Sequence, residues 1–161
     1  MVSLAVERDG EQVVALAAAA GNFTAEEVEC VNELWQAYRE DGEDSSYIFF
    51  VYRDGERVLG FACYGPQSLA QGVFDLYWIA TAPEARGRGV GRALMRTVET
   101  AVRERGGRLL VVETSSTPEY AAARRFYETC GYRYEAVIHD FYTPGDDLLI
   151  FVKQLPPAAA T

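Results

Sequence analysis

The sequence ARGRGVGRAL, at residues 85–94, places three glycines directly before an amphipathic helix pattern. Each glycine disfavours a helix by about 1 kcal/mol relative to alanine, so this position indicates a need for bare backbone. The preceding residues 73–80 have a strand pattern, which ends at Ala82-Pro83. A strand that passes through glycines into a helix exposes unpaired N–H groups at the positive end of the helix dipole. The stretch therefore predicts an anion site, most naturally for a phosphate, with Arg86 and Arg88 as charged donors.

Two common phosphate-binding motifs do not describe this loop. A P-loop requires a lysine followed by serine or threonine, and the loop contains no lysine. Gly87, Gly89 and Gly91 form the pattern GxGxG, whereas a dinucleotide-binding fingerprint requires GxGxxG. The missing lysine thus excludes a P-loop and the spacing of the glycines excludes the dinucleotide fingerprint, which indicates another kind of phosphate loop.

Hydrophobic periodicity places this loop near the middle of a chain that mixes helices and strands. The first helix is expected at residues 9–20, and a capping box at Thr24 and Glu27 begins the second. The third is expected from residue 90 to Gly106-Gly107. The fourth is expected from a Thr117 cap, with Pro118 at its first position, to Gly131. Strands are expected at residues 47–53, 57–64, 73–80, 109–112, 132–141 and 148–153, with a hairpin turn at Asp54-Gly55. This order predicts an α/β (α+β) sandwich in one domain, residues 1–155, with a loose tail at residues 156–161.

Composition limits the class of partner. The formal net charge of −9 argues against nucleic acid, whose binding needs a basic footprint. No apolar run approaches the ~20 residues of a membrane span, which argues against a membrane partner. The alanine-rich segment near the N-terminus lacks a positive flank, so we expect a cytoplasmic protein. Three widely spaced cysteines and a single histidine predict no metal site.

The glycine loop resembles a signature of one enzyme family. Residues 86–91, RGRGVG, are similar to the (Q/R)xxGx(G/A) segment of the GCN5-related N-acetyltransferases, the GNAT family, which wraps the pyrophosphate of acetyl-coenzyme A. The segment AAARRFYETCGYRY resembles the second signature of that family, a helix that ends in Phe-Tyr-x-x-x-Gly-Tyr/Phe. The resemblance implies a three-layer sandwich with a mixed sheet of about six to seven strands and four helices. It also implies contacts with the coenzyme from Trp78, Ile79, Ala80, Thr81, Arg86, Gly87, Arg88, Gly89, Val90, Gly91, Arg92 and Phe126.

The reaction that the resemblance implies is aminolysis of a thioester, with acetyl-CoA as the co-substrate. Backbone N–H groups on the strand with Trp78, Ile79 and Ala80 are expected to stabilise the carbonyl oxygen, where that strand splays from residues 109–112. By resemblance, the tyrosine of the Phe-Tyr pair, Tyr127, lies near the coenzyme sulfur and is the candidate general acid. A phenol with an ordinary pKa of ~10 stays protonated at neutral pH and can donate to the departing thiolate. From its position on the helix alone, Tyr127 is better explained as a core residue, and only the resemblance to the family favours a catalytic role.

Two carboxylates are candidates for the general base. By resemblance, some branches of the family carry a glutamate six residues before the end of the strand, which corresponds to Asp75 here, with a bridging water. Alternation predicts Asp75, Tyr77 and Ile79 on one face of the strand, and Leu76, Trp78 and Ala80 on the other. A structural aspartate or an anchor for the substrate's ammonium group remains an alternative. Glu113 is the second candidate, at the carboxyl end of the next strand, and its alternative is a solvated side chain.

The segment IHDFYTPGDD is expected to border the acceptor pocket, again by resemblance. Its side chains make the rim acidic and aromatic, which suits an amine, although turn chemistry explains the same residues; they include His139, Asp140, Tyr142, Asp146 and Asp147. We therefore expect an acetyl-CoA-dependent N-acetyltransferase that acts on the primary amine of a small molecule, amino acids included, or on an amino terminus. A catalytically silent acyl-CoA sensor and an enzyme for longer acyl groups are the alternatives. The oligomeric state is left open, with a homodimer among the choices.

Overall fold

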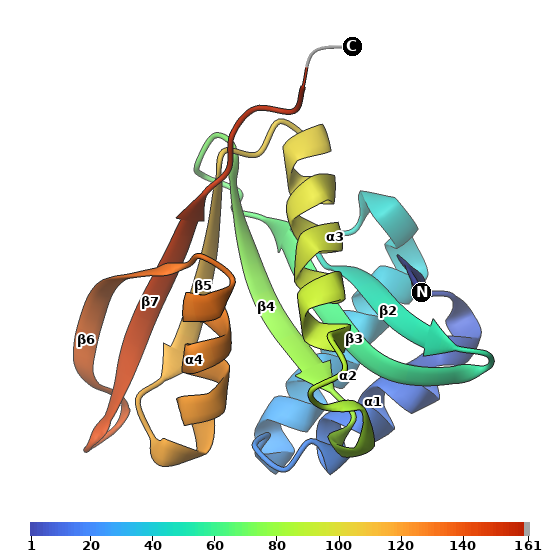
Figure 1. Ribbon diagram of the computed structural model, residues 1–161, viewed down its shortest axis with the longest axis horizontal. Helices are drawn as coiled ribbons and strands as arrows, with labels where there is room; N and C mark the ends of the chain where they lie inside the picture. The colour runs from blue at the N-terminus through green and yellow to red at the C-terminus, as the bar shows by residue number, and fades with distance from the viewer. Residues whose placement is uncertain (160–161) are drawn as a thin grey trace.

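Seven strands form one mixed sheet, in the order β1-β2-β3-β4-β5-β7-β6, in the computed structural model, which describes residues 1–159 (Figure 1). The strands are β1 (Val2–Leu4), β2 (Ile48–Asp54), β3 (Arg57–Pro66), β4 (Val73–Thr81), β5 (Leu109–Ser115), β6 (Arg133–Thr143) and β7 (Asp146–Gln154). Paired strands are antiparallel except β4 and β5, which run parallel near the centre of the sheet. A parallel pair needs a crossover, and the glycine loop with the helix after it supplies that connection.

In the described part of the chain, four α-helices cover the two faces of the sheet (Figure 1). Helices α1 (Gly10–Ala19) and α2 (Ala25–Asp41) lie on one face, and α3 (Val90–Glu104) and α4 (Ala121–Thr129) lie on the other. Short 3-10 turns precede or follow them at η1 (Glu7–Asp9), η2 (Gly42–Asp44), η3 (Pro83–Ala85) and η4 (Pro118–Tyr120). The predicted three-layer sandwich, with a mixed sheet and four helices, is confirmed. Within residues 1–159, none of the helices combines the length and the hydropathy that a membrane span requires.

The predicted N-terminal cap is present at α2 but not at α4. The Thr24 side chain accepts a hydrogen bond from the backbone N–H of Glu27, and the Glu27 side chain accepts one from the backbone N–H of Thr24, as a capping box requires. Thr117 does not cap a helix with its side chain, because its hydroxyl lies 3.0 Å from the Ser115 hydroxyl instead. Pro118 begins the turn η4, and α4 follows three residues later.

Two features of the amino-terminal half differ from the sequence-based expectation. Strand β1 was not predicted, because three residues at a sheet edge are too short to show an alternating pattern. The hairpin between β2 and β3 pairs Asp54 with Arg57, so its turn residues are Gly55 and Glu56, one position later than expected. Gly55 has a φ of 59°, which accounts for a glycine at that position.

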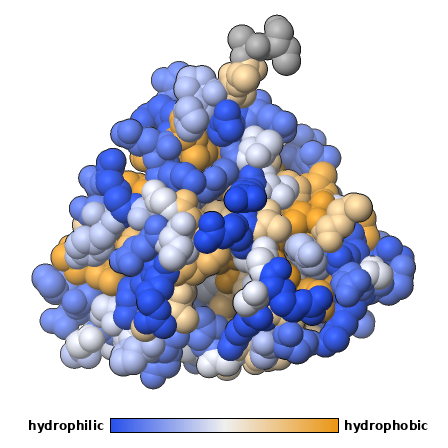
Figure 2. Space-filling model, viewed as in Figure 1, coloured by the Kyte–Doolittle hydropathy of each residue, from blue (hydrophilic) through white to orange (hydrophobic). Residues whose placement is uncertain are grey.

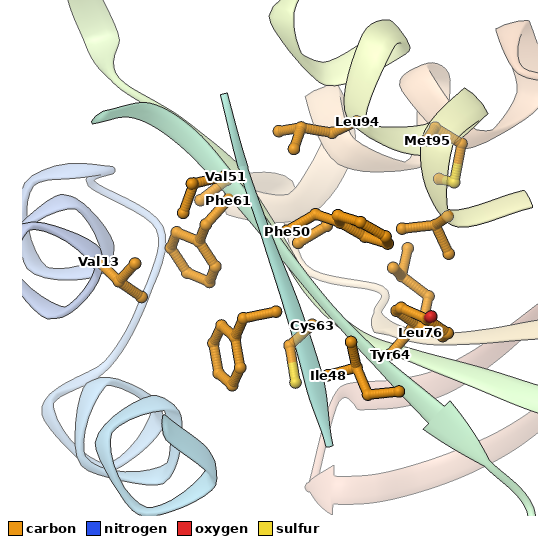
Figure 3. Packing of buried hydrophobic residues seen from close by; sticks show 14 of the residues in the cluster. Val13, Ile48, Phe50, Val51, Phe61, Cys63, Tyr64, Leu76, Leu94 and Met95 are labelled. Atoms are coloured by element: carbon orange, nitrogen blue, oxygen red, sulfur yellow. The ribbon is translucent and has the colours of Figure 1, made fainter. Parts of the chain in front are cut away.

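The core has two halves, one on each side of the central strands (Figure 3). On the α1–α2 side, the buried ring of Phe49 packs edge-on against Trp35 at 5.3 Å between centroids and lies near Phe61. On the α3 side, the ring of Phe50 stacks on Tyr64 at 5.8 Å. Aromatic pairs at these distances add roughly 0.5–1.5 kcal/mol each beyond the area that they bury. Both halves therefore hold β2 and β3 as a rigid base for β4.

Strand β4 contains a β-bulge that changes which side chains share a face. Cys63 pairs with Trp78 and Tyr64 pairs with Leu76, so Tyr77 has no opposite residue on β3. Cross-strand partners share a face of a sheet, and Cys63 lies on the α1–α2 side (Figure 3). The bulge therefore brings Trp78 to the same side as Tyr77.

The predicted alternation along this strand is wrong after the bulge. Ala80 pairs with Phe61 on the α1–α2 side, and Ile79 pairs with Ala62 on the α3 side. Trp78 and Ala80 thus share a face with Asp75, and Ile79 does not. A single extra residue inverts the alternation, and nothing in the pattern of residues 73–81 marks its position.

The carboxyl-terminal tail is partly tied to the domain. Arg103 on α3 donates hydrogen bonds to the carbonyl oxygens of Pro156 and Pro157, at 2.9 and 3.2 Å. Residues 160–161 of the expected tail lie outside the described residues.

Candidate active site

A cleft of about 1120 Å³ opens where β4 and β5 part. The two strands pair only from Val73–Leu109 to Leu76–Val112, although β4 continues to Thr81 and β5 to Ser115. Beyond that point β4 is paired with β3 alone and β5 with β7 alone, which leaves one side of each strand without a strand partner. Figure 1 shows the two strands diverging, and Figure 2 shows a hollow in the lower centre of the same face, with hydrophilic residues around it. The expected splay between these strands is present.

Residues from both faces of the sheet line the cleft. Phe23 and Cys30 come from the α1–α2 side, and Ala123 and Tyr127 come from α4 on the other side. The cleft therefore runs through the gap in the sheet, so that ligands entering from opposite faces meet between β4 and β5. All three catalytic candidates, Tyr127, Asp75 and Glu113, line it.

Tyr127 lies near the end of α4 and is 7% exposed. Its ring packs against Phe151 at 6.0 Å and Tyr132 at 6.3 Å between centroids, which fixes its orientation. Burial raises the pKa of its hydroxyl well above the ordinary value, and no hydrogen bond contributes to that shift. Within residues 1–159, no fully buried side-chain oxygen lacks a hydrogen-bond partner. The Tyr127 hydroxyl is unpaired, so its oxygen must reach the surface of the cleft.

Asp75 and Glu113 face the cleft from the two diverging strands. Asp75 is half-buried on β4 and accepts a hydrogen bond from the Gln67 side chain at 3.2 Å. Burial raises the pKa of Asp75, and the negative charge of Glu113 raises it further. Glu113 is not beyond the end of its strand, as expected from the sequence, but lies inside β5 opposite Ile150. Because β5 continues past the divergence, Glu113 still opens into the cleft.

The substitution Asp75→Asn tests whether Asp75 is the general base, and it is also expected to stabilise the protein at pH 7. If Asp75 accepts a proton, kcat/KM of the wild type rises as the pH passes the raised pKa, and Asp75→Asn removes that rise and lowers the plateau by about 10- to 100-fold. The fold disfavours the ionised carboxylate, so Asp75→Asn should also stabilise the protein at pH 7. That gain should disappear below the unfolded-state pKa of ~3.9, where both states carry the proton.

The matching measurements are a pH–rate profile and thermal unfolding at pH 7 and pH 3. An unchanged rate profile would transfer the role of base to Glu113 or to water. A loss of stability at pH 7 would contradict the assignment of the raised pKa.

The glycine loop joins the end of β4 to the start of α3. Gly87 and Gly89 have φ values of 75° and 80°, and a Cβ built at either position meets nothing within 4 Å. Gly89 occupies the N-cap of α3 without any side-chain cap, so the first N–H groups of the helix face open space. A Cβ at Gly91 would lie 3.3 Å from the Phe126 ring and 3.6 Å from the Thr81 hydroxyl. The loop thus combines bare, positively polarised backbone with close contact to α4 and β4.

The arginines of the glycine loop lie on its surface, whereas its valine packs into the core. The guanidinium of Arg86 donates to the carbonyl oxygen of Ala20 at 2.5 Å, which ties the loop to the end of α1. Arg88 and Arg92 are exposed, and Val90 is buried in the core. None of residues 86–92 lines the cleft, so the loop lies beside the cleft rather than within it.

The β6–β7 hairpin contributes only part of its expected acidic rim. Tyr142 and Asp146 line the cleft, and the Ser115 hydroxyl donates to Asp146 at 2.5 Å. His139 is exposed and hydrogen bonds with Asp147 at 3.1 Å, outside the cleft-lining residues. The backbone N–H of Asp140 and the His139 ring lower the pKa of Asp147.

Glu27 and Tyr120 were not predicted as site residues. The Tyr120 hydroxyl donates to both carboxylate oxygens of Glu27, at 2.7 Å each, and thereby joins η4 to α2 across the cleft. Glu27 was identified only as half of a capping box, a role that does not reveal its second partner. Tyr120 is separated from it by 93 residues, and no local pattern connects the two.

Known proteins are similar to this chain in sequence and in fold. Residues 16–132 match the model of the Acetyltransferase (GNAT) family. The N-acetyltransferase MJ1530 of Methanocaldococcus jannaschii, itself uncharacterized, is 30% identical over 113 residues, which is 68% of each chain. A crystal structure from Desulfovibrio desulfuricans, described as an acetyltransferase of the GNAT family, is 38% identical and superimposes with a TM-score of 0.92, covering 97% of this chain and 100% of that one. A Salmonella typhimurium structure solved with acetyl-CoA superimposes with a TM-score of 0.75 at 20% identity. The superposition covers 100% of this chain and 96% of the Salmonella chain, so the two proteins share the fold.

Proposed function

The chain belongs to the GNAT family of acetyltransferases, and from this premise we propose that it transfers the acetyl group of acetyl-CoA to a primary amine. The acceptor is the amine of a small molecule or an amino terminus. The observation that carries the proposal is the unpaired hydroxyl of the buried Tyr127, in a cleft that passes between two diverging strands. The hydroxyl has no partner within the described chain and reaches the surface of the cleft, so it is free to donate a hydrogen bond or a proton to a ligand there.

The glycine loop is the proposed site for the coenzyme's pyrophosphate. The open space around Gly87 and Gly89 and the uncapped start of α3 suit a phosphate group. The exposed guanidinium groups of Arg88 and Arg92 add positive charge. The known Salmonella structure holds acetyl-CoA on the same fold, which supports this proposal. The strand edge from Trp78 to Thr81, which has no strand partner on the β5 side, is the proposed contact for the pantetheine arm.

The proposed reaction assigns one task to each group. The neutral amine attacks the thioester carbonyl, while backbone N–H groups on β4 stabilise the charge on the carbonyl oxygen. The carbon–sulfur bond then breaks, and the Tyr127 hydroxyl gives its proton to the sulfur. The proton of the amine passes to Asp75, directly or through water, with Glu113 as the second choice.

Thiol release from acetyl-CoA, measured against a panel of amines, amino acids and short peptides, tests the proposed function. We expect release that depends on an amine acceptor, together with a rise in Tm when acetyl-CoA is added. Binding of acetyl-CoA without release for any acceptor would replace the enzyme by a silent acyl-CoA sensor. Absence of binding would overturn both functions.

A further inference from the structure

We infer that the acceptor of this site is a diamine or longer polyamine without a carboxylate, an inference that rests on the proposed function. One amine reacts near Tyr127, and a second, charged amine binds at the outer part of the cleft. The argument uses the charge of the cleft, the position of its carboxylates and the nature of its walls.

The charge of the cleft has one sign. Five carboxylates line it, from five different elements of the fold: Glu27, Asp75, Glu113, Glu119 and Asp146. Of the lining residues within the described chain, none is lysine, arginine or histidine. The side chain of Arg124 lies close by, but it donates to the carbonyl oxygens of Ser115 and Thr117 and is not part of the lining. The cleft therefore attracts cations and repels anions.

The carboxylates form an inner and an outer group. Asp75 and Glu113 lie where the strands diverge and are close enough for Glu113 to raise the pKa of Asp75. Glu27 and Asp146 lie farther along, each fixed by a hydroxyl, that of Tyr120 and that of Ser115 respectively. Hydrogen bonds thus hold Asp75, Glu27 and Asp146 in position before any ligand arrives, which lowers the entropic cost of binding.

Tyr142, which also lines the cleft, lies near carboxylates of both groups. Burial raises the pKa of its hydroxyl to about 12, and the next causes are the charges of Glu113, Asp146 and Glu27. These residues come from β5, β7 and α2, so three elements direct negative charge toward one point.

The walls between the carboxylates are aromatic. Tyr47 and Tyr77 pack edge-on at 5.3 Å, and Phe23 lies 5.2 Å from Trp78. An ammonium group gains attraction over an aromatic face, and a methylene chain gains apolar contact from the same rings. A flexible alkyl chain with an ammonium group at each end matches both features. Tyr127 is independent evidence that the cleft is built for a ligand, because its side chain is 7% exposed, lines the same cleft and leaves its hydroxyl unpaired.

A free amino acid does not fit the same cleft. Its carboxylate would enter a space that holds five negative charges and no lining cation. A carboxylate placed among charges of like sign, with no cation to pair with, is disfavoured. The cleft thus separates acceptors by their second functional group.

The effect of the second functional group can be measured with three acceptors that each have a chain of five carbons: 1,5-diaminopentane, n-pentylamine and 5-aminopentanoate. We expect kcat/KM for the diamine to exceed that for the monoamine by at least about tenfold, and the amino acid to be the poorest substrate. The preference should weaken at high salt, because screening reduces charge interactions. Equal or better turnover of n-pentylamine, of 5-aminopentanoate or of a neutral peptide would overturn the inference and leave the acetyltransferase intact. No turnover of any amine, despite acetyl-CoA binding, would overturn the proposed function and the inference together.

Two variants test the outer carboxylates. Glu27→Gln and Asp146→Asn keep the size of each side chain and remove its charge, and each should reduce the ratio of diamine to monoamine kcat/KM about tenfold. Glu26→Gln is the matched control, because Glu26 is exposed in the same helical turn and does not line the cleft. A ratio that is unchanged in both folded variants, or that falls equally in Glu26→Gln, would contradict a second ammonium site.

Discussion

Gly89→Asp is expected to remove acetyl-CoA binding under conditions in which the wild type is saturated. Gly89 is the N-cap of α3 with a φ of 80°, and the space around a Cβ there is open, so an aspartate side chain fits. Its carboxylate would accept hydrogen bonds from the same N–H groups that we propose for the pyrophosphate. It would also repel the phosphates: two unit charges ~4 Å apart interact by about 4 kcal/mol at an effective dielectric constant of ~20. We expect the Kd for acetyl-CoA to rise at least roughly 30-fold, measured by calorimetry or thermal shift.

Gly89→Asn is the matched control for this variant. Asparagine has nearly the shape of aspartate and tolerates the left-handed region better than most residues, so it reproduces the steric and conformational change without the charge. We expect Gly89→Asn to bind acetyl-CoA far more tightly than Gly89→Asp. Similar affinities for the two variants and the wild type would place the pyrophosphate elsewhere.

The fold was predictable because its main signals are local. The four-residue spacing of Val90, Leu94, Val98 and Val102 identifies α3, and all four are buried. The glycines of the loop could be interpreted as backbone requirements, and the φ values of Gly87 and Gly89 agree with that interpretation. Thr24 and Glu27 mark the start of α2 in the same way. Each of these signals depends on residues within one or two turns of each other.

The details of the candidate site depend on contacts between distant segments, and these were harder to predict. The bulge at Tyr77 is defined by pairing with β3 and not by the sequence of β4, so alternation gave the wrong face for Trp78. Glu113 appeared to follow a strand, because the apolar run ends at Val112; pairing with β7 extends the strand through polar residues. The link between Glu27 and Tyr120 joins two parts of the chain that share no motif. Residue types thus supplied the candidates for the site, and tertiary pairing decided which side chains meet.

Tyr127→Phe is expected to lower kcat by about 100-fold and to leave the affinity for acetyl-CoA nearly unchanged. The hydroxyl makes no hydrogen bond within the described chain, so its removal breaks no internal contact, and Tm should stay the same or rise slightly. A nearby tyrosine supplies the opposite case. The Tyr132 hydroxyl donates to Glu99 at 3.0 Å, so Tyr132→Phe should lose about 1–3 kcal/mol of stability and retain turnover.

The two substitutions remove the same atom from two buried tyrosines whose rings are in contact, so they separate a catalytic hydroxyl from a structural one. Because burial raises the pKa of Tyr127, the hydroxyl keeps its proton past the ordinary tyrosine value of ~10. The wild-type kcat should therefore show no alkaline decline from this group below that pH. Single-turnover rates, Tm values and pH profiles of both variants provide the measurement. If Tyr127→Phe turns over at the wild-type rate, or loses stability as Tyr132→Phe does, then Tyr127 is a core residue and the proton for the leaving sulfur comes from solvent.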